Sequence, residues 1–228
     1  MDSAVTRRFV ISGFQLAKGE ERCSSMQACR PTVYILDDDS RIREALSDLL
    51  DANGYITVTF ESARKYLSHE KANVVSCLIL DMDMPEMTGL ELQREISGAN
   101  APPIIFLTGH GDIQSSVKAM KAGATEFLLK PFDEAELLRS VEAALELDSA
   151  DRAKRTELEE LKKRYELLSP REREVLPFVV SGLLNKQTAG ELGKSEITIR
   201  VQRGQIMKKM AAESLADLVK MATKLGIP

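Results

Sequence analysis

The chain has 228 residues, of which 43% are hydrophobic and 29% are charged, and its formal net charge is −4. A chain of this length can hold one domain of roughly 100–150 residues and a second, smaller domain. No apolar run approaches the roughly 20 residues that cross a bilayer, and an odd count of 3 cysteines does not suit a disulfide framework. We therefore expect a cytoplasmic protein with no membrane partner.

Charge is distributed unevenly along the chain. Residues 31–148 contain 10 Lys and Arg against 21 Asp and Glu, a net charge of −11, whereas residues 166–228 contain 10 against 7, a net charge of +3. An acidic domain followed by a mildly basic one indicates two different partners. A charge of +3 alone does not establish nucleic-acid binding.

The first 30 residues show no sustained hydrophobic period. Two arginines precede the segment FVISGFQLA, as in a secretion signal, but Ser12, Gly13 and Gln15 interrupt its apolar part. We expect residues 1–30 to form a disordered extension, or to precede a true start at Met26.

Five strand–helix units follow one another in residues 31–148. β-branched apolar runs predict strands, and apolar residues at helical spacing predict helices, the first of them capped by Ser40. The expected strands are residues 32–36, 55–60, 74–80, 103–108 and 125–130. The expected helices are residues 40–53, 62–69, 89–96, 112–124 and 132–147. This order predicts an α/β fold, a flavodoxin-like, doubly wound sheet of five parallel strands with helices on both faces.

Polar side chains stand at the ends of four of these strands. Asp37 and Asp38 follow the first strand, Asp81 follows the third, and Thr108 and Lys130 end the fourth and fifth. Parallel strands end at one edge of a sheet, so these groups should meet there. Carboxylates this close repel one another unless a cation joins them, and oxygen-only ligands suit Mg²⁺. Asp81 could then act as a nucleophile toward phosphorus, with Thr108 and Lys130 facing the phosphoryl oxygens.

The segments ILDDD, LILDMDMPEMTG, FLTGHGD and FLLKPF resemble, in this order, the receiver domain of two-component response regulators, over roughly residues 32–147. The resemblance implies that Asp81 is the phosphoacceptor and that a sensor histidine kinase supplies the phosphoryl group. It also implies a metal site and a switch. The Mg²⁺ ligands would be Asp37, Asp38, Asp81 and the backbone carbonyl of Asp83. Thr108 and Lys130 would bind the phosphoryl group, Thr108 and Phe127 would form the switch, and the Lys130–Pro131 bond would often be cis.

A second reading of the same stretch is enzymatic. The Asp81-Met82-Asp83 sequence after an apolar strand also resembles the start of haloacid-dehalogenase-type phosphohydrolases. Those enzymes carry Thr or Val in place of Pro85 and have their further acidic residues downstream, whereas Asp37 and Asp38 lie upstream. This alternative is therefore the weaker one.

Residues 149–165 are expected to form a helical linker, because they contain neither Gly nor Pro. Leu158, Leu161, Tyr165 and Leu168 repeat with 3-4-3 spacing, but the same register passes through charged residues further back. Two alternatives remain open: a short dimeric coiled coil, or a solvated helical spacer that packs one side on a neighbouring domain.

Residues 166–228 carry the pattern of an all-α domain of four helices. Ser169-Pro170-Arg171-Glu172 predicts a capped helix start, and Gly182 ends that helix. A short helix over residues 185–192, a turn at residues 193–195 and a helix over residues 196–210 form a helix-turn-helix, and a fourth helix begins after Ser214.

The third of these helices has one apolar side, formed by Ile199, Ile206 and Met210, that we assign to the core. Its other side carries Ile197 and Val201 and would enter a major groove, with basic residues near phosphates. The expected DNA contacts are Lys186, Ser195, Thr198, Arg200, Val201, Gly204, Gln205 and Lys208.

The segments SPREREVL, NKQTAGELG and SEITIRVQRGQIMKKM resemble the LuxR-type DNA-binding domain, over about residues 166–225. Gln202 stands where many members have His, and Gly204 leaves a position on the DNA side without a side chain. These departures put the bases contacted there in doubt, and we expect Gln202 to affect mainly the helical core.

Together the two resemblances imply a transcriptional response regulator of the FixJ/NarL class, and not an enzyme beyond slow turnover of its own phosphoryl group. Its expected partners are a sensor histidine kinase, promoter DNA, a second copy in a phosphorylation-promoted homodimer, and RNA polymerase. A phosphorylated interaction protein that does not bind DNA is the alternative from another class.

Overall fold

The computed structural model describes residues 30–98, 101–109, 117 and 119–227. Its strands are β1 (Thr32–Leu36), β2 (Ile56–Phe60), β3 (Ser76–Asp81), β4 (Ile104–Thr108) and β5 (Glu126–Leu129). The helices of the first domain are α1 (Ser40–Ala52), α2 (Ala63–Ser68), α3 (Gly89–Glu95) and the long α5 (Glu134–Glu166). The remaining helices are α6 (Pro170–Val180), α7 (Asn185–Glu191), α8 (Glu196–Met210) and α9 (Leu215–Lys224). Residues 1–29 of the expected N-terminal extension, and residues 112–116 and 118 of the expected helix over residues 112–124, lie outside the described residues.

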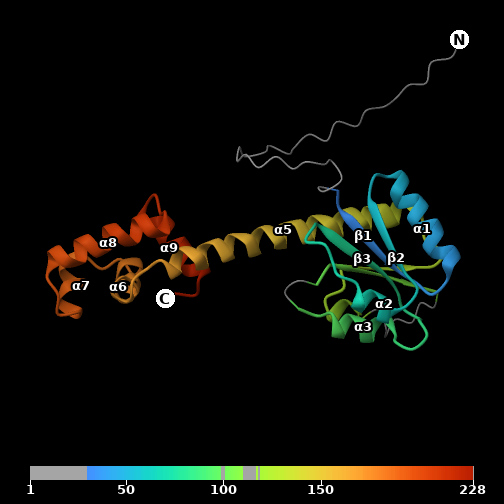
Figure 1. Cartoon of the computed structure of the whole chain (residues 1–228), viewed down its shortest axis with the longest axis horizontal. Helices are drawn as coiled ribbons and strands as arrows, with labels where there is room; N and C mark the ends of the chain where they lie inside the picture. The colour runs from blue at the N-terminus through green and yellow to red at the C-terminus, as the bar shows by residue number, and fades with distance from the viewer. Residues whose placement is uncertain (1–29, 99–100, 110–116, 118, 228) are drawn as a thin grey trace, which may run out of the picture.

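The five strands form one parallel sheet in the order β2-β1-β3-β4-β5. Helices α1 and α5 cover one face and α2 and α3 cover the other (Figure 1). Alternate residues of each strand point to opposite faces. Tyr34 and Leu78 therefore join one buried cluster, while Val33 and Ile79 join the other. The predicted doubly wound α/β architecture is confirmed.

Local capping differs from the sequence prediction at the start of α1. The N-cap is Asp39, whose carboxylate accepts a hydrogen bond from the backbone N–H of Arg41, and Ser40 is the first residue of the helix. The expected cap at Ser40 was therefore wrong by one residue. In the C-terminal domain the predicted capping box is confirmed, because Ser169 N–H donates to Glu172 and Glu172 N–H donates to the Ser169 hydroxyl.

Helix α5 is continuous over 33 residues and runs out of the first domain to the C-terminal helices (Figure 1). Where α5 leaves the first domain, Asp148, 3% exposed, accepts the backbone N–H of Ser76 at 2.8 Å. The Asp148 carboxylate also binds the guanidinium groups of Arg152 at 2.6 Å and Arg155 at 3.6 Å. Arg152 in turn donates to the side chain of Asn73, so the outgoing helix is fixed to the start of β3.

The far end of α5 is packed against the C-terminal domain. Leu161 is 4% exposed, and Tyr165 joins the core cluster of that domain. Arg164 donates to the carbonyl of Met210 at 3.4 Å, and Lys224 forms an ion pair with Glu157. Leu161, Tyr165 and Leu168, three of the four apolar residues that could have formed a coiled coil, are thus buried or partly buried within the chain, which agrees with the spacer alternative.

Each helix that the structure describes is too short or too polar to cross a bilayer.

Candidate functional site

The strand order brings distant polar residues to one edge of the sheet. Leu36 pairs with Leu80, Asp81 with Leu107 and Thr108 with Leu129, so β1, β3, β4 and β5 end at nearly the same level. Their carboxyl ends lie next to the point where the strand order reverses, where open α/β sheets place their sites.

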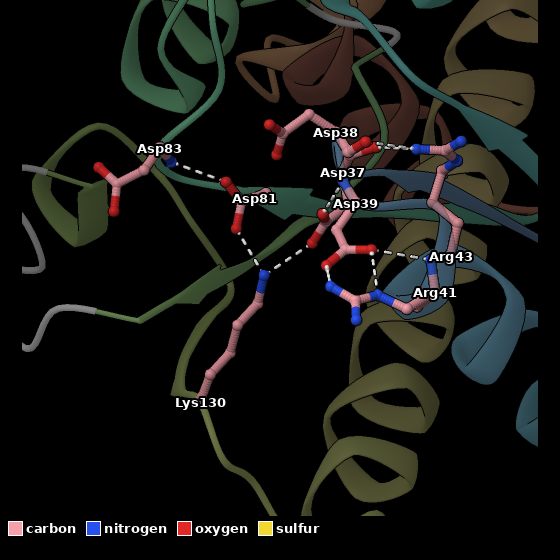
Figure 2. A network of polar contacts seen from close by, with 8 residues as sticks. All are labelled: Asp37, Asp38, Asp39, Arg41, Arg43, Asp81, Asp83 and Lys130. Atoms are coloured by element: carbon pink, nitrogen blue, oxygen red, sulfur yellow. Dashed lines mark hydrogen bonds and ion pairs between the residues drawn. The ribbon is translucent and has the colours of Figure 1, made fainter.

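At this edge the Lys130 ammonium lies between two buried aspartates (Figure 2). Its Nζ is 2.7 Å from Oδ2 of Asp37 and 2.7 Å from Oδ1 of Asp81. The side chains of Asp37 and Asp81 are only 2% and 7% exposed. Lys130 is 93 positions from Asp37 and 49 positions from Asp81 in the sequence, yet the three residues share one charged cluster. This agrees with the prediction from the ends of the strands.

The electrostatics of the cluster leave it short of positive charge. Burial raises the pKa of Asp81, hydrogen bonds from Lys130 lower it, and the negative charge of Asp37 raises it again, with a net upward shift. Burial lowers the pKa of Lys130, but its hydrogen bonds to Asp37 and Asp81 outweigh burial and raise it. One ammonium thus serves two carboxylates, and a further cation would be favoured here.

Backbone groups hold the remaining carboxylate oxygens. Asp83 N–H donates to Oδ2 of Asp81 at 2.8 Å, and Asp39 N–H donates to Oδ1 of Asp37 at 2.9 Å. Arg43 donates to the carbonyls of Asp37 and Asp38 at 2.8 and 3.0 Å, which fixes the loop between β1 and α1 (Figure 2). Sequence reasoning missed Arg43, since a cation on a helical turn gives no sign of which carbonyls it will reach.

Close packing against the backbone of Asp81 explains why a glycine begins α3. A Cβ on Gly89 would lie 2.7 Å from the backbone oxygen of Asp81 and 2.9 Å from Cε1 of Phe106. Gly89 N–H also donates to the carbonyl of Met82 at 3.1 Å. Any larger residue would therefore push on the backbone that carries Asp81.

The expected Mg²⁺ ligands are only partly gathered. Asp37 and Asp81 meet at Lys130, whereas Asp38 is exposed and the Asp83 carboxylate points away from Asp81 (Figure 2). Within the described ranges, no three Asp, Glu, His or Cys side chains form a ready-made metal site. The oxygen-only donors nevertheless fit Mg²⁺ in kind, and the backbone carbonyl of Asp83 would be the further ligand expected from the sequence.

The expected switch residues lie on β4 and β5. Thr108 is 1% exposed, and its carbonyl accepts the backbone N–H of Lys130 at 2.7 Å. Phe127 is half-buried and packs against the cluster under α2 and α3. The Lys130–Pro131 peptide bond is cis, as the resemblance implied.

A second candidate surface lies on α7 and α8. All the residues expected to contact DNA are exposed: Lys186, Ser195, Thr198, Arg200, Val201, Gly204, Gln205 and Lys208. Ile199, Ile206 and Met210 are fully buried on the other side of α8, which confirms the predicted core side. Arg203 contacts the side chain of Asn185 at 3.5 Å and joins the two helices.

Gln202 and Gly204, the two departures from the LuxR-type pattern, differ in environment. Gln202 is half-buried, and its Oε1 has no hydrogen-bond partner among the described residues. Gly204 is exposed, and a Cβ there would meet nothing within 4 Å. Gln202 therefore belongs to the domain interior, as expected, whereas Gly204 belongs to the surface.

Two protein families match the chain. The response regulator receiver domain matches residues 33–142, and the luxR family of bacterial regulatory proteins matches residues 166–222. Nodulation protein W of Bradyrhizobium diazoefficiens is 47% identical over 196 residues, 86% of either chain. The response regulator protein TodT of Pseudomonas putida is 48% identical over 194 residues, 85% of this chain and 86% of TodT.

One further relative by sequence and one solved structure are also similar to the chain. The transcriptional regulatory protein FixJ of Azorhizobium caulinodans is 40% identical over 196 residues, 86% of this chain and 93% of FixJ. The low-resolution structure of the response regulator StyR is 44% identical, covers 86% of this chain and all of its own, and has a TM-score of 0.76. The chain therefore belongs to the FixJ-like two-component response regulators, which join a receiver domain to a LuxR-type DNA-binding domain.

Proposed function

We propose that this chain is a phosphorylation-switched transcription factor of the bacterial cytoplasm, in which Asp81 accepts a phosphoryl group from a phosphohistidine of a sensor histidine kinase. The single observation that carries this proposal is the buried Asp37–Lys130–Asp81 cluster at the edge of the sheet. The match of the chain to the receiver and luxR families favours a regulator over the phosphohydrolase alternative.

The chemistry assigned to the cluster follows from its donors. Asp37, Asp38, Asp81 and the Asp83 carbonyl would hold Mg²⁺, which supplies positive charge for the incoming phosphoryl oxygens. An Asp81 oxygen attacks phosphorus as the phosphorus–nitrogen bond to the kinase histidine breaks. Lys130 turns from the carboxylates to the new phosphoryl oxygens, together with the Thr108 hydroxyl.

The proposed switch couples this event to β4 and β5. The phosphoryl group adds about −1.5 to −2 charge, which draws Thr108 toward it and shifts a pre-existing equilibrium that includes Phe127. Exposed apolar side chains of the same region, Leu129 at 51%, Met120 at 46% and Val117 at 45%, supply a surface for a symmetric dimer.

The dimer would place two α8 helices over half-sites about one helical turn apart, with RNA polymerase as the downstream partner. The exposed row on α8 and the net charge of +3 in residues 166–228 support promoter DNA as the ligand.

The test uses the full-length chain with Mg²⁺ and a small-molecule phosphodonor. We expect selection of a specific site from random duplex DNA, stronger with the phosphodonor than without it. Asp81→Asn should abolish the phosphodonor effect, and Arg200→Ala should abolish site selection while phosphoryl uptake continues. Unchanged phosphodonor-dependent binding by Asp81→Asn would overturn the mechanism, and phosphoryl uptake without any DNA selection would favour an interaction protein.

A further inference from the structure

An apolar strip runs along the exposed side of α8. Ile197 is 72% exposed and Val201 is 59% exposed, among the largest values for big apolar side chains in the part of the chain that is described. They are four residues apart and therefore neighbours on one side of the helix. Gly204 continues the row three residues later. None of the three belongs to the core cluster of the C-terminal domain.

The strip lies within a polar, cationic surround. Thr198, Gln205 and Lys208 are exposed beside it, and the side chain of Arg200 is 69% exposed. The ion pair of Arg200 with Glu196 is 3.4 Å long and lies at the surface, so it holds the guanidinium weakly. This surround fits a polyanion better than an apolar protein surface.

The fold itself does not call for Gly204. A side chain there would meet open space, and glycine within a helix costs conformational entropy. Without a side chain at this position, the backbone of α8 can approach the floor of a groove more closely next to Val201.

On the basis of the proposed DNA-binding function, we propose that Ile197 is a specificity-determining residue that, with Val201, contacts the C5-methyl group of thymine in the major groove. Among the four bases, thymine alone presents an apolar group there. Residues near the N-terminus of a recognition helix are the ones that reach base edges, and Ile197 is the second residue of α8. The sequence placed Ile197 on the side of the helix that would face the groove, but Ile197 was not among the expected DNA contacts.

The test replaces single thymines of the selected site by deoxyuridine, which removes only the methyl group. The phosphorylated full-length chain should lose about four-fold in affinity at one or two thymines, the effect of one buried methyl. Ile197→Ala should weaken binding to the thymine site and reduce the preference for thymine over deoxyuridine, because only Val201 would still contact the methyl group. The control Lys208→Ala should weaken binding to both sites by the same factor and keep the wild-type discrimination.

Gly204→Ala supplies a second measurement. It should leave the thermal midpoint unchanged or raised, and weaken binding to the selected site at least three-fold. Equal binding would overturn the close approach at Gly204.

The outcomes separate the two levels of inference. If the wild-type chain selects a site but ignores every deoxyuridine replacement, or if Ile197→Ala keeps full discrimination, the thymine contact is wrong and DNA binding stands. If no duplex is selected at all, the proposed function fails first.

Discussion

Two buried carboxylates lie at opposite ends of β3, and their partners differ in kind. Asp81, 5% exposed, ends the strand and shares one lysine with Asp37. Asp148, 3% exposed, lies at the beginning of the strand and is held by the Ser76 amide and by two arginines of its own helix. Burial is nearly the same in the two places, so burial alone does not distinguish the carboxylate that we propose to be phosphorylated from a structural one.

What distinguishes them is how replaceable the partners are. Lys130 reaches Asp81 on a flexible stem and is divided between two anions, which would leave the site able to take the proposed cation or phosphoryl group. Asp148 is bound by a strand amide and by guanidinium groups one and two turns further along α5. Loss of any of these interactions at Asp148 would destabilise the packing of α5 against the beginning of β3.

The largest expected effect comes from removing the shared cation. Lys130→Met keeps the apolar stem but leaves two adjacent carboxylates buried, which should lower the free energy of unfolding of the receiver by about 3 kcal/mol. Excess Mg²⁺ should restore more stability in this variant than in the wild type. Hydrogen exchange of the β1 and β3 amides in the full-length chain measures both effects, and unchanged exchange would show that Lys130 is not needed as a counter-ion.

Asparagine substitutions at the two ends of β3 test the comparison itself. Asp148→Asn removes the charge that Arg152 and Arg155 bind, so the receiver should lose about 2 kcal/mol. Asp81→Asn should change stability by less than about 1 kcal/mol, because asparagine can still accept the Asp83 N–H and Lys130 keeps Asp37. Urea unfolding of both variants measures the difference. Equal losses would mean that the two carboxylates have the same structural role.

Gly89→Ala examines the Asp81 end through the backbone. The added methyl group would lie against the Asp81 carbonyl and Phe106, and such overpacking should cost about 2 kcal/mol. Phosphoryl uptake should slow as well, since Asp81 is displaced. The control is Gly98→Ala, where a Cβ meets nothing within 4 Å and both quantities should stay unchanged.

The smallest expected effect concerns Glu172, a structural carboxylate of the C-terminal domain. Burial raises its pKa, but hydrogen bonds from Lys209 and Ser169 outweigh burial and hold the pKa below the ordinary 4.5. The carboxylate therefore stabilises the domain above about pH 4.5, and this contribution is lost as the pH falls through the lowered value. Glu172→Gln should cost about 1 kcal/mol at pH 7 and less near pH 3, measured by thermal unfolding across that range. A loss independent of pH would assign the effect to packing.

The sequence predicted those features that follow from the local periodicity of apolar residues and from the fact that parallel strands end at one edge of a sheet. Apolar strands ending in Asp37, Asp81 and Lys130 must meet at one edge, and the Asp37–Lys130–Asp81 cluster does so. The core side of α8 followed from the spacing of Ile199 and Ile206 in the same way.

Contacts between elements far apart in the chain could not be predicted in this way. Asp148 looked like one more charge on a polar helix, and its role appears only when α5 packs against the beginning of β3, 72 residues away in sequence. The apolar residues Leu161 and Tyr165 likewise have the same sequence spacing whether they pack against a second chain or against the domain that follows. A periodic pattern identifies an apolar side but does not identify what covers it.

The unbroken α5 has a geometric consequence. Its 33 residues extend about 50 Å, and each inserted residue would turn everything beyond it by about 100°. One residue added between Arg155 and Leu158 would rotate α8 about the α5 axis. Seven added residues would return α8 to within about 20° of its original rotation. The length of this helix thus sets the rotation of the C-terminal domain about the α5 axis relative to the first domain. Only insertions or deletions close to a whole number of helical turns preserve that rotation.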